Sequence, residues 1–217
     1  MDLSRLSRNP LALTILALLA EQPRHPYEIQ RLIRERRKDF ARGTQRSLYH
    51  TIDRLVTAGL IVCADVSREG NRPERTVYRL TEDGNDRFME WLGDLLAHPS
   101  PEYPLFTVAV SFLAYLPRET ALRALQARGV ELEGELAGID ARIAGLRRHL
   151  HRLVVLELEY VRALRQGELA WVRSLLQDIG NGELTWDAEA IRARSESLIL
   201  EPPLPEVPLR LLNERAE

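Results

Sequence analysis

The chain has 217 residues, of which 45% are hydrophobic and 29% charged, and its formal net charge is −2. This is the composition of an ordinary globular protein, long enough for one large domain or two small ones. No run of about 18 apolar residues and no signal-like N-terminal segment occurs, which excludes a membrane-spanning helix and a secretory signal and predicts a cytoplasmic protein. The single cysteine, Cys63, excludes an internal disulfide framework, and its apolar neighbours predict a buried, unreactive thiol.

Two helices are predicted at the start of the chain. Asn9 followed by Pro10 indicates a helix start, because Asn favours the N-cap and Pro the first helical position. Residues 11–20 are apolar almost all round, so the helix that they form is expected to be buried. Pro26 is expected to open a second helix. The residues predicted for its inward face are Tyr27, Ile29, Leu32 and Ile33.

A third helix is predicted to be amphipathic and to end at Gly59. Its apolar face carries Leu48, Ile52, Leu55 and Val56, at spacings of three and four. One face can therefore pack while the other reaches a partner. The polar side chains on that other face are Arg46, Ser47, Tyr49, His50 and Arg54.

Residues 61–66 and 75–80 are predicted to form two short strands joined by a turn-rich, basic loop. Such a loop presents donors to a phosphate backbone or a minor groove, although Glu69 and Glu74 interrupt its charge. A helix followed by this hairpin is the order of a recognition helix and a wing. The candidate DNA-binding residues of the wing are Arg68, Asn71, Arg72 and Arg75.

The start of the third helix carries side chains suited to reading DNA. An α-helix fits the major groove, where Arg can bind guanine and Gln can bind adenine through two hydrogen bonds each. Gln45 and Arg46 stand at that end of the helix. Tyr27 and Arg42 are further candidates for contacts with the DNA backbone. The helix residues expected to contact phosphate or sugar are Ser47, Tyr49 and His50. Arg54, one turn further along the same side, is a further candidate for DNA binding.

The near-neutral total charge conceals an uneven distribution. From residue 31 to residue 79, Arg and Lys are twice as numerous as Asp and Glu, whereas acids outnumber bases from residue 90 onward. A positive field over the first third of the chain is compatible with a DNA-binding face. Two other interpretations stay open: the basic residues 31–38 form only a solvated helix face, or the loop between the strands is a simple turn.

A fourth amphipathic helix after Thr81 is expected to complete a winged helix-turn-helix DNA-binding domain over residues 1–97. Three prolines within residues 98–104 exclude a continuous helix there. The remainder is helical by pattern, so we expect a helical dimerisation domain over residues 105–200 and a Pro-rich tail over residues 201–217. The predicted fold class is mainly α with a small β-hairpin, the second domain being an antiparallel or coiled-coil assembly of helices.

Leucine and isoleucine repeat through the second region with spacings of seven, then of four and three in alternation, as in a coiled coil. Four glycines weaken this helix by about 1 kcal/mol each, so it is expected to need a partner. The pattern leaves open whether the chain turns back near His151 or at Gly167. The predicted dimerisation seam consists of Leu125, Leu132, Leu136, Ile139, Ile143, Leu146, Leu150 and Leu153.

Motifs along the first domain resemble those of the PadR family of transcriptional regulators. In order they are His25-Pro-Tyr-Glu-Ile29, Ser47-Leu-Tyr-His-Thr-Ile-Asp-Arg-Leu55, Gly59-Leu-Ile61, Gly70-Asn-Arg-Pro-Glu-Arg-Thr-Val-Tyr78 and Leu80-Thr-Glu-Asp-Gly84. Glu102-Tyr-Pro-Leu-Phe106 and Glu168-Leu-Ala-Trp-Val172 resemble the long branch of that family. The resemblance implies a winged-helix homodimer, usually a repressor, whose C-terminal helices dimerise. The acidic residues of the wing loop depart from the family pattern.

The same resemblance implies a response to phenolic or other aromatic small molecules. Trp91, Phe106 and Trp171 are the candidates for lining an apolar effector pocket at a dimer interface. The alternative interpretation is that these aromatic residues are ordinary core and interface residues.

Two other functional classes compete with a DNA-binding regulator. An enzyme is disfavoured, because the sequence has no Gly-rich phosphate loop, nucleophile elbow or His-Glu-x-x-His helix. His149 and His151 would point to different sides of a helix and lie among arginines, which disfavours a metal. We therefore predict no catalytic residue, metal or cofactor. The alternative function is a protein-interaction adaptor built on a winged-helix scaffold and a coiled coil, which would not need the basic residues of the helix and the wing.

Overall fold

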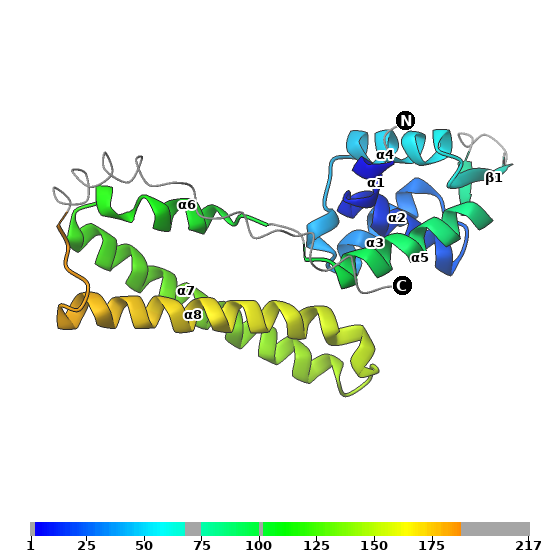
Figure 1. Ribbon diagram of the computed structural model, residues 1–217. Helices are drawn as coiled ribbons and strands as arrows, with labels where there is room; N and C mark the ends of the chain where they lie inside the picture. Colours follow the sequence, from blue (N-terminus) through cyan, green and yellow to red (C-terminus); the bar gives the residue numbers. More distant parts are fainter. Residues whose placement is uncertain (1–2, 68–74, 100–101, 188–217) are drawn as a thin grey trace, which may run out of the picture. The chain divides into compact units, whose positions relative to one another are not determined.

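The computed structural model describes residues 3–67, 75–99 and 102–187 (Figure 1). The chain divides into two units, Met1–Glu102 and Tyr103–Glu217. The described residues form helices and one two-stranded antiparallel sheet, which confirms the predicted fold class. None of these helices combines the length and the apolar character needed to cross a bilayer. The last residues of the predicted dimerisation domain, from residue 188 onward, and the predicted Pro-rich tail lie outside the described part.

The described residues of the first unit form five α-helices and the hairpin. Its elements are α1 (Ser4–Ser7), α2 (Pro10–Glu21), α3 (Pro26–Glu35), the 3-10 turn η1 (Asp39–Ala41), α4 (Gln45–Thr57), β1 (Ile61–Ser67), β2 (Arg75–Leu80) and α5 (Glu82–Ala97). The predicted starts of α2 at Pro10 and of α3 at Pro26 are both confirmed. The Asn9 side chain accepts hydrogen bonds from the N–H groups of Leu11 and Ala12, and His25 forms a capping box with Glu28.

The core of the first unit surrounds α2, whose side chains are largely buried, as its apolar sequence predicts. Ile15 and Leu16 of α2 pack in one cluster with residues of α4, β1 and α5. Tyr27 was expected on the inward face of α3, but 61% of it is exposed. It lies in the first turn of α3, next to the fully buried Pro26, and its backbone is held by the His25 cap rather than by packing.

The sheet pairs Ile61 with Leu80 and Cys63 with Tyr78, and its register shifts after Cys63. Arg24, in the connection between α2 and α3, adds a bridge to this sheet through two backbone hydrogen bonds of 3.0 Å with Tyr78. The expectation of a buried thiol is wrong, because Cys63 is exposed. Ile61 at the start of β1 belongs to the core cluster, but Cys63 and Ala64 after it lie outside that cluster and are exposed.

The described part of the second unit, up to residue 187, contains two long helices. Its elements are α6 (Leu105–Ser111), the 3-10 turn η2 (Leu113–Tyr115), α7 (Arg118–Leu146), the 3-10 turn η3 (Arg152–Val155) and α8 (Leu156–Asn181). The chain turns back between α7 and α8, which settles the open question in favour of the region near His151, whereas Gly167 lies within α8. The interpretation of the heptad repeat as one helix is therefore wrong beyond Leu146.

Helices α7 and α8 pack against each other as an antiparallel hairpin (Figure 1). Ion pairs join Glu133 to Arg173 at 2.7 Å and Arg147 to Glu159 at 2.6 Å, so positions advance along α7 as they recede along α8. Such exposed pairs each contribute at most about 1 kcal/mol. The larger stabilisation comes from the apolar seam, because burial of one aliphatic side chain is worth about 1.5–3 kcal/mol. The buried residues of the seam are Leu125, Leu132, Leu169, Val172 and Ile179.

The turn between α7 and α8 is fastened by Glu159, which accepts hydrogen bonds from Arg152 and Arg147. These hydrogen bonds, the one from Arg152 first, lower the pKa of Glu159 from its ordinary 4.5 to about 2. A carboxyl whose folded-state pKa is depressed stabilises the fold fully above its unfolded-state pKa, and this stabilisation is lost as the pH falls through the folded-state value.

We therefore expect Glu159→Gln to lower the melting temperature at about pH 6, with the difference from the parent shrinking between about pH 5 and about pH 2. Thermal unfolding followed by circular dichroism, at several pH values, measures this difference. Glu131→Gln, at an exposed position of α7, is the control and should show little difference at any pH. A difference for Glu159→Gln that stayed constant down to about pH 2 would contradict the account.

Candidate nucleic-acid interface

Helix α4 is fixed with one face in the core and its first two turns at the surface. The Thr44 hydroxyl accepts a hydrogen bond from the Ser47 N–H at 3.1 Å and caps the helix. Leu48, Ile52 and Leu55 are buried. Thr51 beside them is buried as well, so the side chains on the opposite side of the helix are directed to solvent.

The predicted reading residues are brought together on that outer face. Gln45, Arg46, Tyr49 and His50 are all exposed. Arg54, one turn further along, is half-buried. The Ser47 hydroxyl donates to the Thr44 carbonyl oxygen at 2.7 Å, so it already has a partner within the helix start. The face therefore offers one guanidinium, one carboxamide, one phenol and one imidazole within two turns.

The surface continues from α4 to the start of α3. A hollow of about 580 Å³ lies between these two helix starts and β2. Tyr27 and Arg31 line it from α3, and Gln45 and Tyr49 line it from α4. Tyr27 thus lies beside the candidate DNA-binding residues of α4, where it could contact the DNA backbone next to them. Arg42 precedes α4 and forms an ion pair of 2.8 Å with Asp39.

The wing is described only in part. Arg68, Asn71 and Arg72 lie outside the described residues. Arg75 opens β2, where its backbone pairs with Ser67. The two strands therefore bring both ends of the wing loop together, in the same unit as α4.

Comparison with known proteins identifies this arrangement. Residues 15–90, which run from α2 into α5, match the profile of the transcriptional regulator PadR-like family. Residues 15–90 thus form a PadR-like domain. No curated protein matches the sequence.

Several solved structures share the fold of this chain. Bacillus subtilis PadR in complex with operator DNA is 21% identical with a TM-score of 0.62, over 77% of this chain and 97% of that one. The same protein in complex with p-coumaric acid is 20% identical with a TM-score of 0.65, over 79% and 99%. The Vibrio cholerae virulence activator AphA is 20% identical with a TM-score of 0.60, over 79% and 98%. At this identity the likeness establishes a common fold across both units.

Ion pairs that the sequence did not predict reduce the charge of the basic cluster at residues 31–38. Glu21, at the end of α2, accepts hydrogen bonds from Arg24 at 2.6 Å and from Arg36 at 2.9 Å. The hydrogen bond from Arg36 holds the pKa of Glu21 below its ordinary value. Arg31 pairs with Glu35 at 3.6 Å. The cluster is thus partly structural, and it joins the ends of α2 and α3.

Tyr78 and Arg24 are two further residues that the sequence did not single out. Burial, and secondly the charge of Asp53, raise the pKa of the Tyr78 phenol, so it stays protonated in the neutral range. The buried Arg24 guanidinium donates from Nε to the Leu18 carbonyl oxygen at 3.0 Å. The backbone hydrogen bonds between Arg24 and Tyr78 connect the segment before α3 to β2, so the start of α3, with Tyr27, is held close to this strand.

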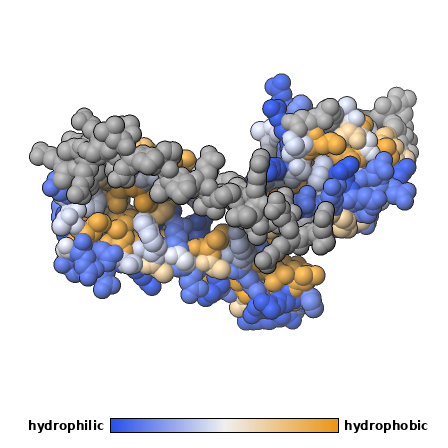
Figure 2. All heavy atoms as spheres, in the orientation of Figure 1, coloured by the Kyte–Doolittle hydropathy of each residue, from blue (hydrophilic) through white to orange (hydrophobic). Residues whose placement is uncertain are grey.

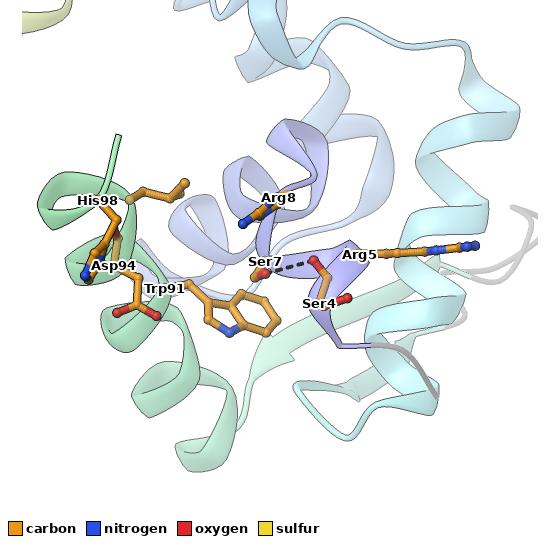
Figure 3. A pocket seen from close by; sticks show the side chains of 8 residues that line it. Ser4, Arg5, Ser7, Arg8, Trp91, Asp94 and His98 are labelled. Atoms are coloured by element: carbon orange, nitrogen blue, oxygen red, sulfur yellow. Dashed lines mark hydrogen bonds between the residues drawn. The ribbon is translucent and has the colours of Figure 1, made fainter. Parts of the chain in front are cut away.

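The three effector candidates belong to different units. Trp91 is 6% exposed in the core of the first unit, where it borders a hollow of about 810 Å³ between α1 and α5 (Figure 3). Arg8, Asp94 and His98 line the same hollow. Phe106 and Trp171 meet edge to face in the second unit, with ring centroids 5.9 Å apart. Of the three effector candidates, only Phe106 and Trp171 are in contact in the structure.

The seam predicted for dimerisation is largely used within the chain. Leu125, Leu132 and Ile143 are buried, and Leu136, Ile139 and Leu146 are half-buried. Leu150 and Leu153 are 43% and 71% exposed. Among the described residues, no group of three or more His, Cys, Asp or Glu side chains is placed to hold a metal ion. His151 instead caps η3 by accepting from the Leu153 N–H at 3.3 Å.

Proposed function

We propose that this protein acts as a homodimeric repressor that binds an inverted-repeat operator through α4 and the wing. The observation that carries the proposal is the exposed polar face on the first two turns of α4, held rigid by the buried face behind it. Arg46 is suited to guanine and Gln45 to adenine in the major groove. Tyr49, His50 and Tyr27 are suited to phosphates, which fix the register of the protein on DNA. We place this DNA binding in the cytoplasm, where the operator DNA lies.

A dimer is proposed because one short helix reads few base pairs. Two copies related by a two-fold axis would bind half-sites about 34 Å apart, or a multiple of that distance. Supporting this, α6 and η2 leave a row of apolar side chains uncovered, spaced three and four residues apart. They are Leu105, Val108, Phe112 and Tyr115, each more than half exposed. An apolar row of this kind is typical of a protein–protein interface.

The test of this function is the symmetry of the binding site. The purified protein is offered the intergenic DNA beside its own coding region, and the bound segment is mapped by footprinting. We expect a two-fold symmetric footprint, and scrambling one half-site should weaken binding by at least about 100-fold, because each mismatched base pair costs about 1–3 kcal/mol. A mapped site that keeps full affinity after one half is scrambled would rule out the proposed dimeric reading.

We also propose that an aromatic carboxylic acid modulates operator binding. Bacillus subtilis PadR has been solved with p-coumaric acid, and the hollow beside Trp91 offers an indole with Arg8 and His98 at its wall. A ligand acts only if it binds the DNA-competent and DNA-incompetent states with different affinity. Titrating p-coumarate into the operator complex should therefore lower its anisotropy, and unchanged operator affinity at saturation would exclude this compound.

A further inference from the structure

The turn of the α7–α8 hairpin carries charge and apolar surface that the proposed DNA-binding site does not use. We call residues 147–154 the hairpin tip. It contains three arginines, two histidines and no acidic residue. Glu159 neutralises Arg147 and Arg152 in part. Arg148 and His149 are exposed and have no ion-pair partner within the described residues, so the hairpin tip keeps a positive surface.

The same turn exposes three aliphatic side chains. Leu150, Leu153 and Val154 are 43%, 71% and 61% exposed, although Val155 beside them is fully buried. Figure 2 shows hydrophobic and hydrophilic surface side by side at this end of the hairpin. An apolar patch rimmed by charge is typical of an interaction site. The hairpin tip therefore suits a partner surface that is both apolar and acidic.

The outer face of α5 has that complementary character. Phe88 and Trp91 face the core, so helical spacing directs Asp86, Met89 and Glu90 outward. Met89 is 56% exposed, and Leu96 on the same helix is 89% exposed. The acidic side chains of α5 outnumber its single basic residue, Arg87. They are Glu82, Asp83, Asp86, Glu90 and Asp94, all exposed.

We propose that the hairpin tip of one copy docks on the outer face of α5 in a second copy of this chain. The inference rests on the proposed homodimer, in which two-fold symmetry makes the contact twice. Opposite charges on the two surfaces favour this pairing and give it its orientation. Helix α5 lies on the other side of its unit from α4 (Figure 1), so the contact leaves the recognition helix free. The contact also connects the α7–α8 hairpin of one copy directly to the DNA-binding unit of the other.

The experiment uses one charge reversal on each surface of the full chain, Arg148→Glu and Asp86→Arg. Both side chains are exposed and outside the cores, so both variants should fold as the parent does. Each variant alone juxtaposes like charges at both contacts, and we expect its dimer Kd, measured by sedimentation, to rise about tenfold or more. Arg123→Glu, an equal charge change at an exposed position near the other end of α7, should leave the dimer Kd unchanged.

Mixing the two variants is the decisive step. In a heterodimer of Arg148→Glu with Asp86→Arg, one contact pairs Glu with Arg and the other keeps the original pair, so both contacts are matched. Native mass spectrometry should then show heterodimer well above the statistical proportion of about half that wild-type copies give. A contact within one chain would leave each variant mismatched, and mixing would give only the statistical proportion.

Three results would overturn the proposal. The first is an unchanged dimer Kd in both single variants, and the second is statistical mixing of the two variants. The third is an Arg148→Glu variant with unchanged dimer Kd but an operator salt slope reduced by about one unit, which would make the hairpin tip a DNA contact. Failure of the underlying homodimer is seen separately, as a wild-type chain that stays monomeric at every concentration tested.

Discussion

Replacing Arg46 with alanine is expected to weaken operator binding by about 10- to 100-fold, because a guanidinium bound to guanine through two hydrogen bonds contributes about 1–3 kcal/mol of discrimination. Arg46 is exposed in the first turn of α4, with the capped helix start fixing its position. The loss should be largest for the intact operator and small for unrelated DNA. Fluorescence anisotropy with both duplexes measures it.

The control for this prediction is Arg123→Ala, which removes the same charge from an exposed position on α7. It should bind the operator as the wild type does. If Arg46→Ala weakens binding to all duplexes equally, and lowers the salt slope by about one unit, Arg46 is a phosphate contact. The assignment of base reading to Arg46 would then be wrong.

Replacing Gly84 with alanine is expected to destabilise the first unit by about 3 kcal/mol. Gly84 is buried in the first turn of α5, and a Cβ at this position would lie directly against the Leu60 carbonyl oxygen and 2.8 Å from its carbon. That carbonyl accepts hydrogen bonds from the Thr81 N–H at 3.1 Å and from the Thr81 hydroxyl at 2.9 Å. Neither backbone segment can move without breaking the α5 cap.

Urea unfolding of the full chain measures this loss in the transition of the first unit. Gly93→Ala is the matched control, because a Cβ there meets nothing within 4 Å on the same helix. It should stabilise the unit by about 0.5–1 kcal/mol, since alanine favours a helix over glycine. Equal stability of Gly84→Ala and the wild type would show that α5 does not pack as closely on Leu60 as described.

Local signals in the sequence predicted much of the first unit. Asn9, His25-Pro26 and Thr81 mark helix starts through contacts within three residues, which a sequence displays directly. Gly59 follows α4 with a φ of 73°, the left-handed conformation in which glycine commonly ends a helix. The outer face of α4 followed from the spacing of its apolar residues. The need for glycine at position 84 could not be predicted in this way, because the backbone of Leu60, which lies outside α5, approaches Gly84 closely.

The misplaced residues depend on packing between distant segments. The thiol of Cys63 was expected to be buried from its neighbours in the strand, but it is exposed, because β1 joins the core cluster at Ile61 and not at Cys63. Arg36 looked like part of a free basic face, although it pairs with Glu21, fifteen residues earlier. The heptad repeat of α7 indicated a seam without saying whose helix fills it, and α8 of the same chain does so at Leu125 and Leu132.

The most direct test of the central claim is operator affinity across a salt series, measured by anisotropy with competitor DNA present. A regulator that contacts phosphates through α3, α4 and the wing should bind its operator with a Kd of about 10⁻⁸ M or tighter at physiological salt, and log K should fall linearly with log salt. Absence of salt-dependent binding to any duplex would contradict the account and favour an adaptor that uses the winged helix only as a scaffold.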